Sequence, residues 1–91
     1  MIRKEVEIKN KFGLHARPAS LLVKLASSFD CDIQLAKDDT EVNAKSILGV
    51  MMLAAGPGQR IAVIADGEGE ADAVHAIVSL VESKFGEATA D

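Results

Sequence analysis

The sequence predicts an α+β fold, an open-faced sandwich in which a four-stranded, mainly antiparallel sheet carries three helices on one face. Two observations lead to this prediction. Four segments alternate apolar and polar residues as strands do, and three others repeat their apolar residues at helical spacing. Their order is strand, helix, strand, strand, helix, strand, helix, and helical connections in this order favour helices packed on one side of the sheet. With 91 residues, of which 48% are hydrophobic, the chain is expected to form one domain over residues 1–91 around a single core.

The first element is a predicted strand with one solvent-facing side. Ile2, Val6 and Ile8 are separated by charged residues, which is the alternation of a half-buried strand. The loop from Asn10 to Gly13 then leads to His15.

The first helix is expected to begin within a residue or two of His15. Proline is well tolerated only in the first turn of a helix, and Pro18 therefore marks the helix start. The apolar residues that follow at helical spacing are Ala19, Leu22, Val23, Ala26 and Phe29, whereas Ser20, Lys24 and Ser27 fall on the opposite side.

The middle of the chain predicts a hairpin and a short helix. Cys31, Ile33 and Leu35 alternate as a second strand, a turn follows at residues 38–39, and Val42 centres a short third strand. The second helix is expected from Ser46, its N-cap, to about Leu53. The Gly56-Pro57-Gly58 run is expected to end this helix.

The C-terminal part predicts a strand and a last helix. Residues 60–65 are expected to form the fourth strand, and the glycine-containing segment 66–69 to form a turn. Glu70 and Asp72 then lie in the first helical turn, where negative charge suits the helix dipole. The expected apolar face of this helix consists of Ala71, Val74, Ile77, Val78, Val81 and Phe85.

Composition argues against several classes of function. The formal net charge of −4 disfavours nucleic-acid binding, and three Phe without Trp or Tyr leave little for base stacking. Arg17, Lys24 and Lys45 are candidates for local positive patches. The longest apolar run, residues 47–55, is far shorter than the ~20 residues that span a bilayer, so membrane insertion is not expected. One cysteine and no signal-like N-terminal segment indicate a cytoplasmic protein.

Neither a metal nor a cofactor is expected. The two histidines are far apart, and with one cysteine they offer no recurring ligand spacing, whereas structural zinc needs four ligands. His75 lies beside the apolar stripe of the last helix, where a surface histidine is the simplest interpretation. The glycine runs lack the loop and Lys-Ser/Thr pattern of a nucleotide site and are interpreted as turns.

The segment Gly13 to Ala19 indicates a phosphate site that contains a nucleophile. The backbone N–H groups of Ala16 and Arg17 at a helix start favour an anion, and the guanidinium of Arg17 suits phosphate oxygens. An exposed imidazole is largely neutral at physiological pH and offers a ring nitrogen that accepts a phosphoryl group. The alternative is that His15 only caps the helix and Arg17 is a solvated charge, with no phosphate site.

The full string Gly13-Leu14-His15-Ala16-Arg17-Pro18-Ala19 resembles the active-site signature of the histidine-containing phosphocarrier (HPr) family of the bacterial phosphoenolpyruvate-dependent phosphotransferase system. The chain length, the element order and a second string, residues 43–50, also resemble that family. The resemblance implies that His15 is phosphorylated on Nδ1 by phosphorylated Enzyme I. It further implies that the group then passes to an EIIA-type domain, often of a sugar transporter, and that the chain is a carrier rather than an enzyme.

Ser46 has two interpretations. As an N-cap it contributes about 1 kcal/mol to helix stability and needs no regulation. The family resemblance implies that it matches a regulatory serine modified by an ATP-dependent HPr kinase/phosphorylase in some bacteria. A phosphoserine would add about −1.5 to −2 charges at a helix start, which the fold tolerates but which would oppose an acidic partner.

The second helix is more apolar than a surface helix requires, and part of it is expected to stay exposed as a docking surface. Methionines beside a phosphate site suit contacts with several partners. The expected docking residues are Ser20, Lys24, Ile47, Leu48 and Met51. A helix pressed fully into the core is the alternative.

Three functions remain in competition: a phosphocarrier that uses His15, a small enzyme such as a phosphohydrolase, and a regulatory binding module controlled by Ser46. The enzyme is disfavoured because no carboxylate lies near His15 in the sequence. Related regulatory proteins lack the active-site histidine, which this chain has. The stretch at residues 54–59 is uncharged, whereas members of the family often carry lysines and acids there. The sequence therefore does not decide whether the chain serves sugar uptake or the nitrogen-related branch of the phosphotransferase system. A monomer is expected.

Overall fold

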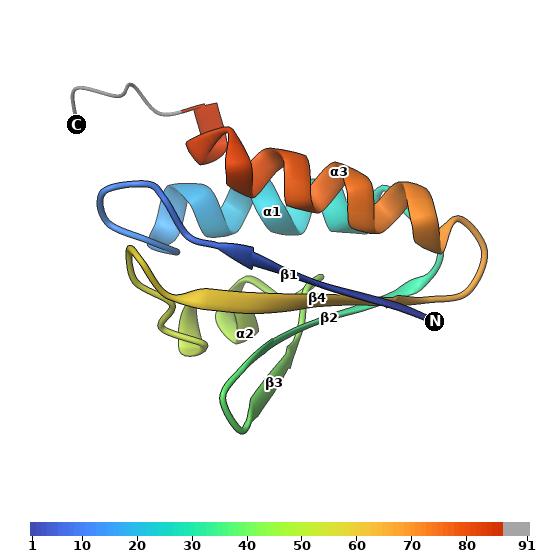
Figure 1. Cartoon of the computed structure of the whole chain (residues 1–91). Helices are drawn as coiled ribbons and strands as arrows, with labels where there is room; N and C mark the ends of the chain where they lie inside the picture. The colour runs from blue at the N-terminus through green and yellow to red at the C-terminus, as the bar shows by residue number, and fades with distance from the viewer. Residues whose placement is uncertain (87–91) are drawn as a thin grey trace.

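The computed structural model describes residues 1–86; residues 87–91 of the expected domain lie outside the described part. The elements, labelled in Figure 1, are β1 (Ile2–Glu7), α1 (Ala16–Ser27), β2 (Asp32–Lys37), β3 (Thr40–Asn43), α2 (Ile47–Met52), β4 (Arg60–Asp66) and α3 (Glu70–Glu82), followed by the 3-10 turn η1 (Lys84–Gly86). This order of strands and helices is the predicted one.

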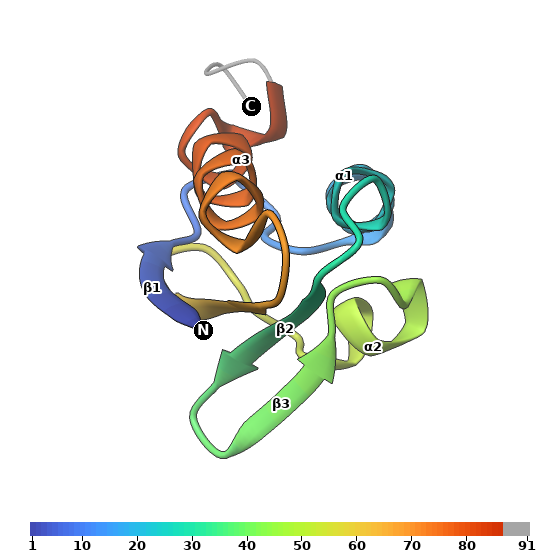
Figure 2. The same cartoon turned by 90° about the vertical axis from the view of Figure 1, so that its right-hand side faces the viewer.

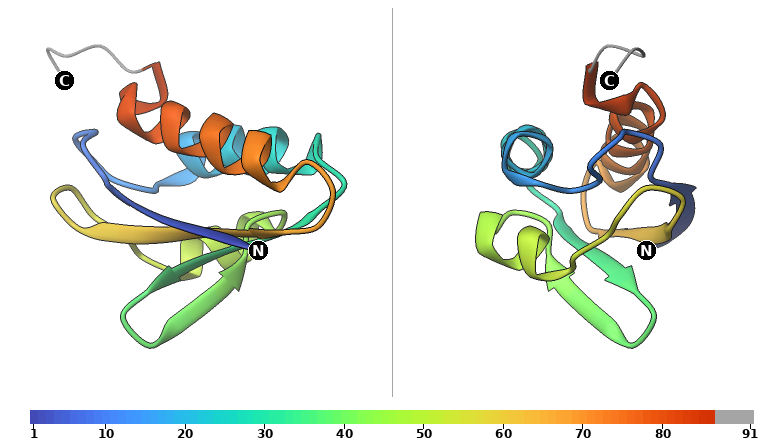
Figure 3. Two further views of the ribbon diagram at one scale, coloured as in Figure 1. Left: turned by 45° about the vertical axis from the view of Figure 1, so that its right-hand side comes forward. Right: turned by 90° about the vertical axis from the view of Figure 1, so that its left-hand side faces the viewer.

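The four strands form one sheet in the order β1-β4-β2-β3, and every neighbouring pair is antiparallel. The helix α3 packs on β1 and β4, α1 packs beside α3, and α2 packs against α1 and β3. Figure 2, a view along α1 and α3, shows the three helices on one side of the twisted sheet, and the opposite view in Figure 3 agrees. The predicted open-faced α+β sandwich is therefore confirmed.

The core lies between the sheet and the helices and follows the alternation of the strands. Val6 and Ile8 at the end of β1, with Ile33 and Leu35 in β2, are buried, and so are the inward residues of β4. Full burial of each aliphatic side chain of this size contributes about 1.5–3 kcal/mol. The outward neighbours in β1, Arg3 and Glu5, are exposed, as the predicted alternation requires.

The two long helices bury most of the predicted faces, but two predicted face residues, Phe29 and Phe85, lie beyond the ends of α1 and α3. In α1 the buried residues are Pro18, Ala19, Leu22 and Ala26. In α3 the prediction that Ala71 is buried is wrong, because Ala71 is exposed and Ala73 takes the core position. The helix starts one residue after Gly69, which has a left-handed conformation, and this start sets the face that meets the sheet.

The short helix α2 begins and ends about where predicted, but other residues end it. Ser46 is its N-cap, and the hydroxyl oxygen accepts a hydrogen bond from the Gly49 N–H at 3.1 Å. The helix ends at Met52, and Ala54 with φ of +54° turns the chain before the expected Gly56-Pro57-Gly58 run is reached. Burial of Leu53 and Ala55 on either side of Ala54 accounts for this early turn, because both side chains must face the core.

Candidate functional site

His15 lies at the N-terminus of α1, as the position of Pro18 predicts. It is the N-cap residue with extended backbone, and its carbonyl accepts the first helical hydrogen bond from the Ala19 N–H at 2.9 Å. The first N–H groups of an α-helix have no acceptor within the helix. The N–H groups of Ala16 and Arg17 are of this kind, and the helix dipole places partial positive charge beside them.

The loop that carries His15 is held at several points by its own backbone and by a distant segment. Gly13 and Asn10 are joined twice: the Asn10 Nδ2 donates to the Gly13 carbonyl at 2.7 Å, and the Gly13 N–H donates to the Asn10 carbonyl at 3.2 Å. The Leu14 N–H donates to the Ala55 carbonyl at 2.9 Å, in the loop that follows α2. His15 therefore sits on a loop whose path is set by the α2–β4 connection, and both loops lie at the same end of the molecule (Figure 1).

Asn10 is a buried polar residue within this loop. Its side chain is 1% exposed, and its Oδ1 is buried without a hydrogen-bond donor among the described residues. A buried amide that keeps only part of its hydrogen bonds lowers stability unless it fixes a structure that the fold needs. Here the structure that it fixes is the turn immediately before the site.

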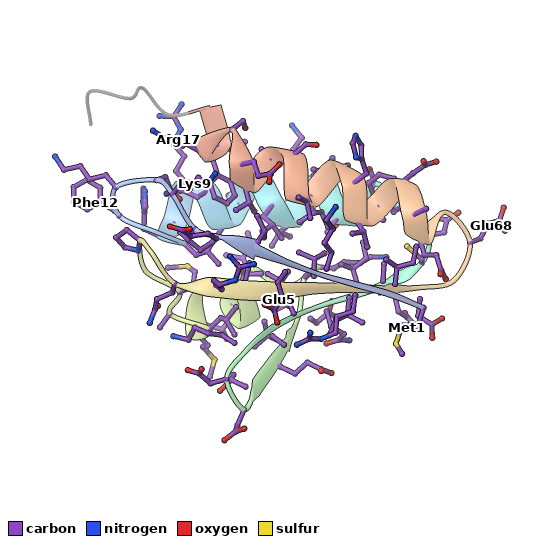
Figure 4. All side chains as sticks on the ribbon, viewed as in Figure 1. Met1, Glu5, Lys9, Phe12, Arg17 and Glu68 are labelled. Atoms are coloured by element: carbon purple, nitrogen blue, oxygen red, sulfur yellow. The ribbon has the colours of Figure 1, made fainter. Side chains whose placement is uncertain are left out.

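The imidazole of His15 is half-buried and contacts an aromatic ring that sequence reasoning did not single out. The ring of Phe12 lies edge-to-face with it, with ring centroids 5.9 Å apart and an interplanar angle of 87°. The Lys11 Nζ lies 5.3 Å from the centroid of the Phe12 ring. Figure 4 shows Phe12, Lys9 and Arg17 at the same end of the molecule, opposite Met1 and Glu68. An aromatic residue placed just before the glycine of the loop was the available sequence signal.

The predicted polar residues of α1 lie on its solvent side. Arg17, Ser20 and Lys24 are all exposed, so a phosphate at the helix start or a docked protein can reach them. Arg17 is thus in the first turn of α1, with its side chain exposed to solvent. This arrangement supplies cationic donors to an anion without enclosing it.

Ser46 and the chain before it are held firmly. The Lys45 Nζ donates to the Phe29 carbonyl at 2.7 Å, just beyond the end of α1, and the Ser46 N–H donates to the Asn43 carbonyl at 3.1 Å. The cap contact predicted for Ser46 is confirmed. The start of α2 is thereby tied to the end of α1, and Lys45 is engaged in this contact.

Exposed apolar side chains cover the solvent side of α2. We call this surface the α2 patch; it consists of Ile47, Leu48, Met51 and Met52, which are 46%, 71%, 41% and 70% exposed. Val50 on the opposite side is fully buried, so α2 is partly exposed as the sequence predicts. Neighbouring apolar residues left in solvent are a feature of protein-binding surfaces.

Within residues 1–86, no three His, Cys, Asp or Glu residues lie together as a metal site. His75 is exposed on α3, and Cys31 is a buried thiol. None of the described helices is long and apolar enough to cross a membrane. Two hollows in the open face of the sheet are lined mostly by residues of β1, β2 and β4.

Comparisons with known proteins agree on one family. The family model for the PTS HPr component phosphorylation site matches residues 2–83. The phosphocarrier protein HPr of Treponema pallidum is 47% identical over 87 residues, which are 96% of this chain and 99% of that protein. The crystal structure of HPr-C-His from Thermoanaerobacter tengcongensis superposes with a TM-score of 0.93 at 50% identity, covering 97% of this chain and 99% of the other.

A regulatory relative is also similar. The crystal structure of Crh, a Bacillus subtilis catabolite repression protein, superposes with a TM-score of 0.75 at 43% identity, covering 92% of this chain and 97% of the other. It is described as an intertwined dimer with a swapped domain. Some similar proteins therefore form dimers.

Proposed function

The chain belongs to the HPr family of phosphotransferase-system phosphocarriers, and from this premise we propose that His15 accepts a phosphoryl group from phosphorylated Enzyme I and passes it to an EIIA-type domain. The members that carry the name HPr are phosphocarriers rather than enzymes. The observation that carries the proposal is the position of His15 as the N-cap of α1, directly before the N–H groups of the first helical turn.

The transfer needs no group beyond the two proteins. A bond forms between a ring nitrogen of His15, proposed to be Nδ1, and the phosphorus, while the bond between phosphorus and the donor atom breaks and the donor keeps the electron pair. The second transfer repeats the step with His15 as the leaving group. The N–H groups of Ala16 and Arg17 and the guanidinium of Arg17 stabilise the phosphoryl oxygens in both steps.

The exposure of the site suits a carrier. The His15 ring is half-buried, and Arg17, Ser20 and Lys24 around the start of α1 are exposed. Donor and acceptor must approach the same nitrogen in line, which a closed cavity would prevent. The α2 patch, with Ile47, Leu48 and Met51, together with Ser20 and Lys24, is the docking surface that we propose for both partners.

We also propose that Ser46 is phosphorylated by an HPr kinase/phosphorylase. Ser46 caps α2 directly beside Ile47 and Leu48 of the α2 patch. A phosphate there would place negative charge at the edge of the docking surface, and repulsion of an acidic partner would reduce phosphoryl transfer to His15.

A regulatory protein-binding module controlled by Ser46 is the second candidate function. The similarity to Bacillus subtilis Crh, a catabolite repression protein, favours it. The same α2 patch would then bind the regulatory partner, and His15 would have no role.

Two incubations, one with Enzyme I and phosphoenolpyruvate and one with ATP and a kinase, separate the two functions. The chain is mixed with Enzyme I and phosphoenolpyruvate and analysed by mass spectrometry. A carrier gains one acid-labile, alkali-stable phosphoryl group, His15→Ala gains none, and His75→Ala, which changes the exposed histidine of α3, gains it as the wild type does. An acid-stable adduct that forms only with ATP and a kinase would instead support the regulatory module.

We further propose that the chain works in the cytoplasm as a single domain and a monomer. Light scattering at micromolar concentration should give a mass near 9.6 kDa. A mass twice as large would contradict the proposed monomer and indicate a dimer, as described for Crh.

A further inference from the structure

Phe12 is a large apolar residue that folding alone does not explain. Its side chain is 65% exposed, in a chain whose other two Phe residues are buried or half-buried. An exposed aromatic ring contributes little burial energy, because most of its surface remains in water. Any role of Phe12 beyond folding therefore depends on its neighbours.

The neighbours of Phe12 are the reactive imidazole and a cation. The ring is edge-to-face with His15, with centroids 5.9 Å apart, and Lys11 Nζ lies 5.3 Å from its centroid. Both distances fall within the range in which aromatic pairs and cation–π pairs attract. The Phe12 ring thus contacts both the His15 ring and the Lys11 ammonium group.

The backbone places Phe12 with little freedom. The next residue, Gly13, has φ of +66° and is hydrogen-bonded to Asn10 through both its N–H and its carbonyl. Leu14 is bonded to Ala55 and is buried. With Asn10 and Leu14 fixed on either side, the loop presents the Phe12 ring at a defined place beside His15 (Figure 4).

We propose that Phe12 is a positioning residue for phosphoryl transfer: its ring holds the His15 imidazole in one orientation and keeps the Lys11 ammonium group close to the site. This inference rests on the proposed function of His15. Alignment of the attacking nitrogen with phosphorus matters because a near-attack geometry accounts for much of the rate of such transfers. Once His15 carries the phosphoryl group, a positive charge held on the Phe12 ring offsets part of its negative charge.

Substitutions at Phe12 separate the effects of the ring from those of bulk. Phe12→Ala removes both, Phe12→Leu keeps the bulk, and Phe12→Tyr keeps the ring. In assays with Enzyme I, we expect kcat to fall by about 3- to 10-fold in the Ala and Leu variants, with KM for the chain changed by less than about two-fold. Phe12→Tyr should restore the wild-type kcat, and Lys11→Gln should lower kcat by about two-fold.

A docking role predicts a different result, for which Leu48→Ala provides the comparison. Leu48 is 71% exposed in the α2 patch, and its substitution should raise KM while kcat changes little. If Phe12→Ala behaves as Leu48→Ala does, Phe12 is a docking residue and the positioning role is wrong. Equal kcat values for Phe12→Leu and the wild type would also overturn it, because bulk would then suffice.

A measurement without any partner tests the ring contact itself. NMR of the unphosphorylated chain should show NOEs between the ring protons of Phe12 and His15, and Phe12→Leu should shift the His15 ring resonances while amide shifts in the sheet stay unchanged. Absence of these NOEs would overturn the proposal. If the NOEs are present and the wild type accepts no phosphoryl group from Enzyme I, the proposed function fails while the ring contact stands.

Discussion

At the scale of single residues, the site depends on groups that never touch the phosphate. Gly13 has φ of +66°, and a Cβ atom added to it would lie 2.3 Å from the Ala55 carbonyl oxygen and 2.8 Å from the Gly56 Cα. Both of these atoms are backbone, so they cannot move aside as a flexible side chain would. The close approach of the two loops therefore requires glycine at this position.

Gly13→Ala should destabilise the chain more than Gly58→Ala. Both glycines have positive φ, so each substitution costs about 1–2 kcal/mol of backbone strain, but a Cβ on Gly58 would meet nothing within 4 Å. The added clash in Gly13→Ala should lower the free energy of unfolding by at least about 1 kcal/mol more. Urea denaturation of both variants measures this difference, and equal losses would show that the loops can separate without penalty.

Arg17→Ala should slow phosphoryl transfer without affecting folding. Arg17 is exposed in the first turn of α1, and alanine is a good helix former, so the melting temperature should hardly change. Loss of charge-assisted hydrogen bonds to a phosphoryl group should lower the transfer rate by about 10-fold or more. Rapid-quench measurement of transfer from Enzyme I tests this, with Ser27→Ala on the same helix as the control. A wild-type rate in Arg17→Ala would remove Arg17 from the site.

The sequence predicted the position of His15 at a helix start, because proline restricts the helix start locally. It did not predict the Phe12 contact or the burial of Asn10. Both depend on the loop being held against Ala55, a contact between segments far apart in the chain. Local propensity carries no information about such a contact, although Phe12 beside a glycine was visible in the string.

At the scale of elements, local sequence signals decide where a helix begins, whereas tertiary packing decides where it ends and which face it buries. Ser46 caps α2 as its residue type predicts. The end of α2 near Leu53 is as predicted, but the turn is made by Ala54, with φ of +54°, and not by the expected glycine run, because Leu53 and Ala55 are both buried. The choice of Ala73 over Ala71 in α3 is likewise set by how the helix meets the sheet. Tertiary packing overrides propensity at these positions.

Two substitutions at Ser46 should separate its capping role from its proposed regulatory role. Ser46→Ala removes the oxygen that accepts from Gly49 and should lower the free energy of unfolding by about 1 kcal/mol, measured by denaturation. Ser46→Asp keeps an N-cap acceptor and should retain most of the stability, while its charge weakens binding to Enzyme I. Titration calorimetry with Enzyme I checks the second effect. Equal affinities of Ser46→Asp and the wild type would contradict the regulatory role.

Glu70 at the start of α3 should make stability depend on pH. The Gly67 N–H, which donates to the carboxylate at 3.0 Å, and the Met1 ammonium group at 3.0 Å hold the pKa of Glu70 below its ordinary value of 4.5. A lowered pKa in the folded state means that this stabilisation is present above pH 4.5 and is lost as the pH falls through the folded-state pKa.

The matching effect on the amine has the opposite sign. The hydrogen bond to Glu70 is the main cause that raises the pKa of the Met1 amine above 8.0, so its stabilisation is present below pH 8.0 and is lost as the pH rises through the folded-state pKa. The melting temperature of Glu70→Gln should therefore fall furthest below that of the wild type between about pH 5 and pH 8. Asp72→Asn in the same turn is the control. A difference for Glu70→Gln that persists unchanged at acidic pH would contradict this origin.

At the scale of the whole molecule, the sheet and the charges place the site at one end. The predicted antiparallel sheet is confirmed, but the sequence did not predict that β4 lies between β1 and β2, since the strand patterns do not name their partners. This order brings the loop after β1 beside the loop before β4, where the Gly58 N–H donates to the Ile8 carbonyl at 2.8 Å. The His15 loop and the end of α2 thereby share one end of the molecule.

Positive charge gathers at the end of the molecule that carries the His15 loop, and it should steer association with Enzyme I. The net charge is −4, yet Lys9 and Arg17 lie at the end that carries Phe12 (Figure 4), beside Lys11 in the sequence. A partner with an acidic surface would be attracted to this end and repelled by the rest. The association rate with Enzyme I should then fall as ionic strength rises, because the screening length is only about 8 Å at physiological salt.

Lys9→Gln should lower this association rate a few-fold at low salt and hardly at all at high salt. Lys4→Gln changes the net charge equally but lies in the middle of β1, opposite Val63, so its effect should be smaller. Stopped-flow measurement of both variants at low and high salt separates local steering from the overall charge, since overall charge would affect the two alike. Equal rates for the two variants at low salt would mean that the basic end does not guide the partner to His15.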